Sequence, residues 1–311
     1  MEILKVEAGT VPDYGALNIE LDTKSNTFEV RELPNITCDT TSFEVLSTIR
    51  YDPLITKSKA ELPEKLTTKM FFLWEIHMKR LQVTLDFFHN FKLDSESNEE
   101  TKGRKKDVSK EDDSVEVDGK IIFESIRDAF MKGNVLTANP LKVRLLVTID
   151  GDVKVELHET PVRTNLFIGL SENYPKELIY DLYVDMTSVF PSPFTSFKTT
   201  KRDVYNRARK RCLPGKSALE EVLLINSSDE VMEGLIFNVA VELKDGSFAT
   251  PPLSSGCLCG VTRHMLLAKG LIFEDKIHVS ELLVGHEVLL FNGIVGVAKG
   301  IIRGFVEPED Q

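Results

Sequence analysis

The chain has 311 residues, of which 42% are hydrophobic and 28% are charged. This length and apolar content allow a substantial hydrophobic core, which excludes a largely disordered protein. The net charge of −11, from 38 basic and 49 acidic residues, repels polyanions and disfavours a dedicated nucleic-acid or membrane-surface binder. The sequence opens without a basic and then apolar leader and contains no apolar run of membrane-spanning length, so we expect a soluble cytoplasmic protein.

The cysteines indicate a reducing compartment. Cys38, Cys212, Cys257 and Cys259 are too few and too scattered for a disulfide framework in a chain of this size. Cys257 and Cys259 form the one close pair, but a zinc site would need a second pair or histidines at ligand spacing nearby. We therefore predict no metal site and interpret both residues as small loop residues.

Residues 1–160 are expected to form a smaller α+β domain. The pattern TSFEVLSTIR over Thr41–Arg50 predicts a strand, and residues Phe71–Phe88 predict a helix. One face of this helix would carry the apolar and aromatic positions Trp74, His77, Leu81, Leu85 and Phe88. Residues 94–120 are largely charged or small and predict a solvated insertion. Its KGRKK run could be a nuclear-localisation signal, but the acidic flanks favour a flexible loop.

A hairpin is expected near the end of this first domain. Helical spacing returns over Ile121–Met131, and the run KVRLLVTI over Lys142–Ile149 predicts a strand. Asp150-Gly151 supplies a turn into a partner strand over Val153–Leu157. The stretch Glu159–Asn165 lacks strong periodicity and is the expected boundary between the two halves.

Residues 161–311 are expected to form a larger α+β domain. Strands are predicted over Asn165–Leu170 and over Leu219–Asn226, which reads LEEVLLIN. Between them, Arg202–Arg211 predicts a helix with a basic face. RNA binding is one interpretation of that face, but the acidic protein as a whole favours an ordinary solvated helix.

A carboxylate is predicted at the end of a hairpin in the second half. Glu233 and Gly234 precede an alternating apolar strand over Leu235–Leu243. Asp245-Gly246 then supplies the turn into a short strand that ends at Thr250.

A small-residue loop follows this hairpin. Pro251-Pro252 stops the strand, residues 254–260 are rich in serine and glycine, and a helical pattern begins at Thr262. Such a loop presents free backbone N–H groups and the positive end of a helix dipole to an anion. For the loop alone, an ordinary hairpin followed by an ordinary helix cap is the favoured interpretation.

Several linked motifs carry a resemblance to a known family. Lys198 is followed by EGLIFN at 233–238, TPPL at 250–253, GVTR at 260–263 and HEVLLFNG at 286–293. This order resembles that of the fold-type IV pyridoxal-phosphate enzymes, which include branched-chain aminotransferases, D-amino-acid aminotransferases and aminodeoxychorismate lyases. The resemblance extends from FEVLSTIR to FNGIVGV. It implies a two-domain α+β fold like that of D-amino-acid aminotransferase, pyridoxal 5'-phosphate as cofactor, a small-molecule substrate and a homodimer.

The resemblance also implies roles for three charged residues. Lys198 corresponds to the catalytic lysine that attaches the cofactor and moves the substrate proton, which requires a neutral amine for part of the cycle. Glu233 corresponds to the carboxylate that keeps the pyridine nitrogen protonated, so that the ring accepts electrons. Arg80, in HMKRLQVTL, corresponds to an arginine that binds the cofactor phosphate.

Five further residues correspond to uncharged cofactor contacts of the family. Leu258 would pack against the cofactor ring. Phosphate contacts would come from Val261 and Thr262, and from Asn292 and Gly293 on the HEVLLFNG turn. The resemblance does not name the groups that bind substrate carboxylates.

Departures from the aminotransferase pattern favour the lyase branch. The tyrosine usually found five residues after the lysine is Asp203 here, and the nearest tyrosine is Tyr205, which leaves the contact to the cofactor's phenolic oxygen open. The turn at Phe291–Gly293 and the run IRYDP at Ile49–Pro53 both resemble the lyases, of the fungal type with an acidic insertion.

The leading functional hypothesis is therefore the conversion of 4-amino-4-deoxychorismate to 4-aminobenzoate and pyruvate, a step of folate biosynthesis. Arg50 and Arg144 are candidate cations for the substrate carboxylates, although either could be a structural ion-pair partner. A branched-chain or D-amino-acid aminotransferase is the second hypothesis. The third is a non-catalytic relict of the fold that uses the charged insertion as an interaction surface.

Overall fold

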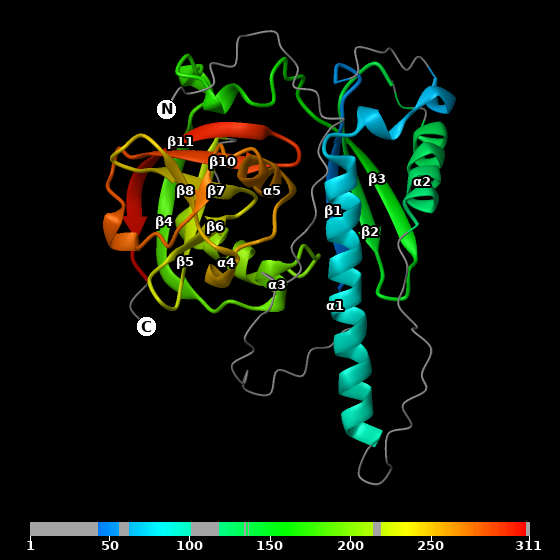
Figure 1. Cartoon of the computed structure of the whole chain (residues 1–311), viewed down its shortest axis with the longest axis horizontal. Helices are drawn as coiled ribbons and strands as arrows, with labels where there is room; N and C mark the ends of the chain where they lie inside the picture. The colour runs from blue at the N-terminus through cyan, green and yellow to red at the C-terminus, as the bar shows by residue number, and fades with distance from the viewer. Residues whose placement is uncertain are drawn as a thin grey trace. The chain divides into compact units, whose positions relative to one another are not determined.

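A computed structural model divides the chain into two compact units (Figure 1). The N-terminal unit contains the described residues up to Pro161 together with Lys198–Lys201, and the C-terminal unit contains Val162–Phe197 and the chain from Arg202 onward. The sequence predicted two domains, 1–160 and 161–311. It did not predict that Lys198–Lys201, within the second, would pack with the first unit. The structure describes residues 43–55, 62–100 (backbone only for 90–100), 118–133, 135, 137–213 and 219–308.

The N-terminal unit is a small antiparallel sheet with two helices. The sheet has the order β1-β2-β3, formed by Val45–Tyr51, Leu141–Val147 and Val153–Glu159. Helices α1 (Trp74–Glu100) and α2 (Gly119–Lys132) contribute to one hydrophobic cluster with the sheet. The predicted hairpin of β2 and β3 is confirmed by their antiparallel register.

Alternation along β1 decides which side chains reach this core. Val45, Ile49 and Tyr51 belong to the cluster shared with the helices, because successive side chains of a strand point to opposite faces. The predicted face of α1 is confirmed, since its members are all buried: Trp74, His77, Leu81, Leu85 and Phe88.

The predicted insertion at 94–120 was wrong at both ends. Helix α1 continues to Glu100, and α2 starts at Gly119 with Asp118 as its N-cap, whose carboxylate accepts a 2.7 Å hydrogen bond from the backbone N–H of Lys120. Charged and small residues are compatible with a solvated helix as well as with a loop, so composition did not separate the two. The KGRKK run lies outside the described residues.

The C-terminal unit is built on a mixed eight-stranded sheet with the order β6-β5-β4-β11-β10-β7-β8-β9. The pairs β11 with β4, β4 with β5, and β8 with β9 are parallel, and the other neighbours are antiparallel. The strands are β4 (Tyr180–Val189), β5 (Glu220–Asn226), β6 (Val231–Gly234), β7 (Asn238–Glu242), β8 (Phe248–Thr250), β9 (Phe273–Glu274), β10 (Glu287–Asn292) and β11 (Gly296–Val306).

This sheet curls on itself. The edge strand β6 lies against β7, and the turn between them is closed by a 2.7 Å hydrogen bond from the N–H of Gly234 to the carbonyl of Phe237. In the sheet order, however, β5, β4, β11 and β10 lie between these two strands. Figure 1 shows the resulting curved sheet. Its enclosed face holds one hydrophobic cluster, which includes Leu223 of β5, and its opposite face holds another, which includes Leu224. Strand β5 is therefore buried on both sides.

Short helices complete the C-terminal unit. They are α3 (Pro193–Ser196), α4 (Asp203–Cys212) and α5 (Val261–Ala268). Helix α4 packs on β4 and β5, and the helix predicted at Arg202–Arg211 is confirmed to within one residue at each end. Its basic face is partly used within the fold, since Arg211 Nε donates a 3.0 Å hydrogen bond to Oδ1 of the buried Asp185.

Two predicted strands needed correction. The segment 165–170 is not a strand but contains a single 3-10 turn, Ile168–Leu170, preceded by a hydrogen bond from the N–H of Phe167 to the Asn165 side chain. The strand predicted at Leu235–Leu243 begins only at Asn238, because Gly234–Phe237 forms the turn between β6 and β7. Glu233 therefore lies inside β6 rather than before a strand.

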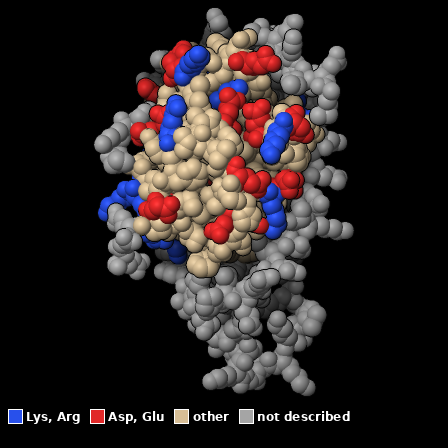
Figure 2. Space-filling view, turned by 90° about the vertical axis from the view of Figure 1, so that its left-hand side faces the viewer, with Lys and Arg blue, Asp and Glu red and all other residues tan. Residues whose placement is uncertain are grey.

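Two observations concern membrane spans and surface charge. In the described part of the chain, no helix combines the length and the apolar character needed to cross a bilayer. Figure 2 shows one face on which basic and acidic side chains are intermingled around a broad uncharged area. Neither basic nor acidic side chains alone cover the described part of that face.

We predict unequal effects for alanine at two glycines that both have positive φ. A Cβ at Gly296 (φ 76°) would meet the carbonyl oxygen of Leu166 at 2.0 Å, whereas one at Gly246 (φ 81°) would meet nothing within 4 Å. The Leu166 oxygen accepts a 2.7 Å hydrogen bond from Val297 N–H, so it cannot withdraw without losing that bond. In urea denaturation, Gly246→Ala should cost about 1 kcal/mol and Gly296→Ala several times more. Equal losses would contradict the crowding argument.

Candidate active site

The centre of the site in the C-terminal unit is the buried carboxylate of Glu233. Its Oε1 accepts a 2.7 Å hydrogen bond from the hydroxyl of Tyr205 on α4. Its Oε2 accepts from the backbone N–H of Leu258 at 3.0 Å and from the amide of Asn238 at 3.4 Å. Because Glu233 is only 3% exposed, these donors replace the water that an ionised carboxylate would otherwise require.

Tyr205 is held in place by more than this bond. The guanidinium of Arg202 lies 4.4 Å from the centre of its ring, and Arg202 also donates a hydrogen bond to the carbonyl of Leu235. Burial, reinforced by the negative charge of Glu233, raises the pKa of Tyr205 well above its usual value. The phenol therefore stays protonated and acts as a donor to Glu233.

The loop before α5 is fixed against the same carboxylate. Asn238 Nδ2 donates a 2.8 Å hydrogen bond to the carbonyl of Leu258, so both sides of the Leu258 main chain are held. A Cβ at Gly260 would lie only 1.8 Å from Oδ1 of Asn238. Glycine is therefore required at 260 for the loop to approach Asn238 so closely.

The start of α5 has the properties of an anion site. Its N-cap, Gly260, has no side chain that could satisfy the first N–H groups of this eight-residue helix. The side chain of Thr262 in the first turn is buried, and its Oγ1 has no hydrogen-bond partner among the described residues. Uncapped N–H groups beside an unpartnered hydroxyl fit a phosphate group.

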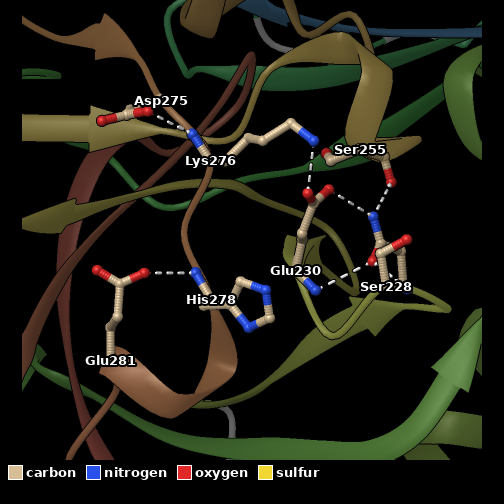
Figure 3. A network of polar contacts seen from close by, with 8 residues as sticks. Ser228, Glu230, Ser255, Asp275, Lys276, His278 and Glu281 are labelled. Carbon is tan, nitrogen blue, oxygen red and sulfur yellow. Dashed lines mark hydrogen bonds and ion pairs between the residues drawn. The ribbon is translucent and has the colours of Figure 1, made fainter.

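A polar network supports the beginning of this loop (Figure 3). Glu230 accepts hydrogen bonds from Nζ of Lys276 at 2.7 Å and from Nδ2 of Asn226 at 3.1 Å. The same Asn226 nitrogen lies 3.3 Å from the carbonyl oxygen of Ser255 and donates to it. The loop that carries Leu258 is thus tied to the end of β5.

In the N-terminal unit, Lys198 lies on a segment that extends the sheet. Its carbonyl accepts a 2.9 Å hydrogen bond from the N–H of Leu46, and Thr199 forms an antiparallel bridge with Val45. The N–H of Thr200 donates to the carbonyl of Glu44 at 2.9 Å. The main chain on both sides of Lys198 is therefore fixed beside β1, while its side chain is partly exposed.

Arg80 and His77 lie one turn apart on the buried face of α1. Arg80 is 5% exposed, and its backbone carbonyl accepts a 2.7 Å hydrogen bond from the hydroxyl of Thr84. His77 Nδ1 lies 2.8 Å from the hydroxyl of Ser47 on β1. A buried cation beside a buried imidazole is unusual for a purely structural helix face.

The sequence pattern of the family described as amino-transferase class IV matches residues 65–300. The chain belongs to this family. The matched residues include the charged positions discussed above, Lys198, Arg80 and Glu233. The resemblance drawn from sequence is confirmed.

Two curated relatives come from yeasts. The chain is 39% identical over 192 residues to "Aminodeoxychorismate lyase" of Saccharomyces cerevisiae, which covers 52% of this chain and 51% of that protein. It is 35% identical over 171 residues to "Putative aminodeoxychorismate lyase" of Schizosaccharomyces pombe, covering 54% of this chain and 68% of that protein. The match to the first thus spans about half of that relative's length.

Solved structures of the family share the fold. A putative amino-acid aminotransferase from Mesorhizobium loti has a TM-score of 0.57 and 23% identity, over 84% of this chain and 99% of that one. A putative 4-amino-4-deoxychorismate lyase from Legionella pneumophila has a TM-score of 0.54 and 12% identity, over 91% of this chain and 93% of that one. A PLP-bound hypothetical aminotransferase from Mycobacterium tuberculosis has a TM-score of 0.54 and 15% identity, over 90% of this chain and 89% of that one. The predicted α+β fold of a fold-type IV pyridoxal-phosphate enzyme is confirmed.

The two candidate substrate cations differ in their surroundings. Arg50 is fully buried, donates to Asp52 at 2.8 Å and to the carbonyl of Pro161 at 2.9 Å, and so has a structural use. Arg144 is one-third exposed at 33% and contacts Glu156 at 2.6 Å. A hydrogen bond from Lys154 is the main cause that lowers the pKa of Glu156, and Arg144 adds to it. Both arginines thus have an ion-pair partner, and Arg144 differs from Arg50 in being accessible to solvent.

The turn at residues 292 and 293 has a visible structural use. Oδ1 of Asn292 accepts from the N–H groups of Ile294 and Val295 at 2.9 and 2.8 Å, and its Nδ2 donates to the carbonyl of Ile236 at 3.1 Å. The bond to Ile236 ties this turn to the segment that joins β6 to β7. The phosphate contacts inferred for Asn292 and Gly293, like the ring contact of Leu258 and the phosphate contact of Val261, stay predictions.

The position of the missing aminotransferase tyrosine lies at the start of α4, and the contact to the phenolic oxygen of the cofactor stays open. Asp203 begins α4, and Tyr205 directs its hydroxyl to Glu233. Sequence reasoning noted Tyr205 only as the nearest tyrosine, and it overlooked Asn238 although that residue ends the quoted EGLIFN motif. The sequence prediction placed His77 on the buried face of α1 but gave it no chemical role. The spacing of three residues between His77 and Arg80, which puts both on one helix face, was the available signal.

In the cysteine pair of the loop before α5, Cys257 is buried and Cys259 is partly exposed. The thiol of Cys257 lies 3.5 Å from the carbonyl of Pro252, and burial raises its pKa to about 12. A thiol with this pKa is neutral at physiological pH and a poor metal ligand. Among the described residues, no group of histidine, cysteine and acidic side chains could hold a metal ion.

We predict that Tyr205→Phe costs about 1.5–3 kcal/mol of unfolding free energy at neutral pH, because a bond to a buried carboxylate is lost. The raised pKa means that the folded state keeps a proton that an unfolded tyrosine loses near its ordinary value of 10.0. Wild-type stability should therefore fall as pH rises above 10.0, and less steeply in the variant.

Tyr174→Phe is the control for this prediction. Its hydroxyl donates to a backbone carbonyl, that of Leu178, at 3.0 Å. The loss expected at neutral pH is about 1 kcal/mol. Denaturant titrations at several pH values measure both variants, and equal losses at neutral pH would mean that the Glu233 contact adds no stability.

A second prediction tests the structural use of Arg50. Asp52→Ala would leave the Arg50 guanidinium buried without its carboxylate, which should cost about 3–5 kcal/mol in urea denaturation. Asp181→Ala, which removes an exposed partner of Arg303, should cost less than about 1 kcal/mol. A small effect of Asp52→Ala would return Arg50 to the list of substrate-binding candidates.

Proposed function

We propose that this protein is a pyridoxal-phosphate-dependent lyase that converts 4-amino-4-deoxychorismate to 4-aminobenzoate and pyruvate. The proposal rests chiefly on the 39% identity to the S. cerevisiae protein named as an aminodeoxychorismate lyase. The FNG turn and the IRYDP run favour the same branch of the family.

The residues of the C-terminal unit suit pyridoxal phosphate. The cofactor, when bound, supplies an electron sink for charge that develops on the substrate carbon. Glu233, held by Tyr205 and Asn238, would keep the pyridine nitrogen protonated, and the first turn of α5 with Thr262 would bind the phosphate. Each of these groups is fixed by hydrogen bonds or packing before a ligand arrives, which favours binding.

Lys198 would act on the substrate as a base. It removes the proton from the carbon that bears the amine, the bond from the ring to the enolpyruvyl oxygen breaks, and the ring becomes aromatic. The released enolpyruvate takes up a proton and becomes pyruvate, so the reaction needs neither water nor an oxidant. Arg144 is the cation we assign to a substrate carboxylate.

The test compares two substrates for the same protein. Purified protein given 4-amino-4-deoxychorismate should release pyruvate and 4-aminobenzoate in equal amounts, measured by a lactate-dehydrogenase assay and by chromatography. Lys198→Ala should lower the rate by at least about 100-fold, whereas Lys201→Ala on the same segment should retain most of it. Transfer of an amino group from branched-chain or D-amino acids to 2-oxoglutarate, without pyruvate release, would favour the aminotransferase instead.

Covalent trapping separates the enzyme from a non-catalytic relict. Borohydride reduction should fix the cofactor on Lys198, which peptide mass spectrometry identifies independently of turnover. Protein without any trapped cofactor would contradict both enzymatic hypotheses. We also propose a homodimer in the cytoplasm, and light scattering of the purified protein tests the dimer.

A further inference from the structure

The hydroxyl of Tyr205 has one proton and two acceptors within reach. It lies 2.7 Å from Oε1 of Glu233 and 3.4 Å from the carbonyl oxygen of Thr195. The shorter contact is also the one to a carboxylate, so the proton points to Glu233. Both side chains are buried, which strengthens this bond because water does not compete for either group.

Arg202 makes this phenol a stronger donor. Its guanidinium lies 4.4 Å from the centre of the Tyr205 ring, where the cation draws electron density from the phenol. The phenol nevertheless keeps its proton. Burial and then the charge of Glu233 raise the pKa of Tyr205 well above its usual value, and the charge of Arg202 opposes this only in part.

Arg202 also connects Tyr205 to the turn that follows Glu233. It donates a hydrogen bond to the carbonyl of Leu235 in that turn. The two neighbouring residues of α4 and its N-cap therefore contact the Glu233 segment twice, once at the carboxylate and once at the main chain. Together these contacts restrain the position and the rotation of the carboxylate.

The charge of Glu233 would decide where a proton lies on a ring nitrogen that faces it. A carboxylate and a pyridine nitrogen can share one proton, which stays on the nitrogen as long as the carboxylate is well stabilised as an anion. Tyr205, Leu258 and Asn238 all donate to the carboxylate, at 2.7, 3.0 and 3.4 Å. The bond from Tyr205 is the shortest of these three, so its loss should affect the anion most.

We propose that Tyr205, polarised by Arg202, is a positioning residue that keeps the Glu233 carboxylate ionised and thereby holds a proton on the pyridine nitrogen of the cofactor. The inference rests on the cofactor of the proposed function but not on which reaction follows. It gives a role to a tyrosine that lies two positions after the place of the aminotransferase tyrosine, Asp203. The residues that carry it all belong to the C-terminal unit.

The test measures the protonation of the ring nitrogen directly. Holoprotein is prepared with pyridoxal phosphate that carries a heavy nitrogen isotope in its ring, and the nitrogen chemical shift is recorded by NMR at neutral pH. The wild-type resonance should lie at the position of a protonated pyridine. Tyr205→Phe removes the donor and keeps the ring, so the carboxylate competes better for the shared proton. The ratio of protonated to neutral nitrogen should fall about tenfold, the value of one hydrogen bond to a charged group.

Two further variants make the result specific. Tyr174→Phe is the matched control, because it removes a phenol of the same unit whose hydroxyl donates to the carbonyl of Leu178. It should leave the nitrogen shift unchanged. Arg202→Gln keeps the phenol but removes the cation over its ring, and should move the shift in the same direction as Tyr205→Phe by a smaller amount. If Tyr205→Phe does not fold, Arg202→Gln decides the question.

The outcomes separate this inference from the proposed function. An unchanged shift in Tyr205→Phe, or an equal change in Tyr174→Phe, would overturn the role of Tyr205 while leaving the cofactor in place. A wild-type resonance at the position of neutral pyridine would overturn it as well, since Glu233 would then hold no proton on the nitrogen. Failure of the wild-type protein to bind pyridoxal phosphate would instead overturn the proposed function, and the inference with it.

Discussion

The buried carboxylate of Glu233 is the group on which the arrangement of the C-terminal site depends. An ionised carboxylate at this depth is tolerated only with donors around it, because its desolvation costs several kcal/mol. Those donors come from three separate pieces of chain: Tyr205 on α4, Asn238 on β7 and the main chain of Leu258 before α5. Satisfying one charge therefore fixes a helix, a strand and a loop relative to each other, and the start of α5 follows the loop.

The turn after Glu233 is held from two sides. Glu221 on β5 accepts hydrogen bonds from the N–H groups of Leu235 and Ile236 at 2.9 and 3.3 Å, and Asn292 donates to the carbonyl of Ile236. Burial raises the pKa of Glu221, which the backbone donors oppose. The end of β6 is thus a rigid support, and rigid supports keep a charged side chain in one orientation toward a ligand.

Sequence alone predicted the helix and strand content well where patterns were strong, as for the buried face of α1 and for β5. It also singled out Arg80, Lys198 and Glu233 from the family motifs that contain them, and their roles toward the cofactor stay predictions. It missed two partners of Glu233, since Tyr205 comes from a helix 28 positions away and Asn238 from across the β6 to β7 turn. Periodicity records which face of an element is buried, but it does not record which polar groups meet there.

Lys198–Lys201 packs with the N-terminal unit although the chain on both sides belongs to the C-terminal unit. During synthesis, β1 emerges long before this segment, which later covers its free edge through the bonds at Leu46 and Thr200. The far end of that edge is covered independently by residues 70–72, since Phe72 N–H donates to the carbonyl of Arg50 at 2.8 Å. An uncovered start of β1 is of the kind that recruits other strands. A fragment that ends at Pro161 would lack these bonds, so the segment that carries Lys198 also covers the start of the exposed edge of the smaller unit's sheet.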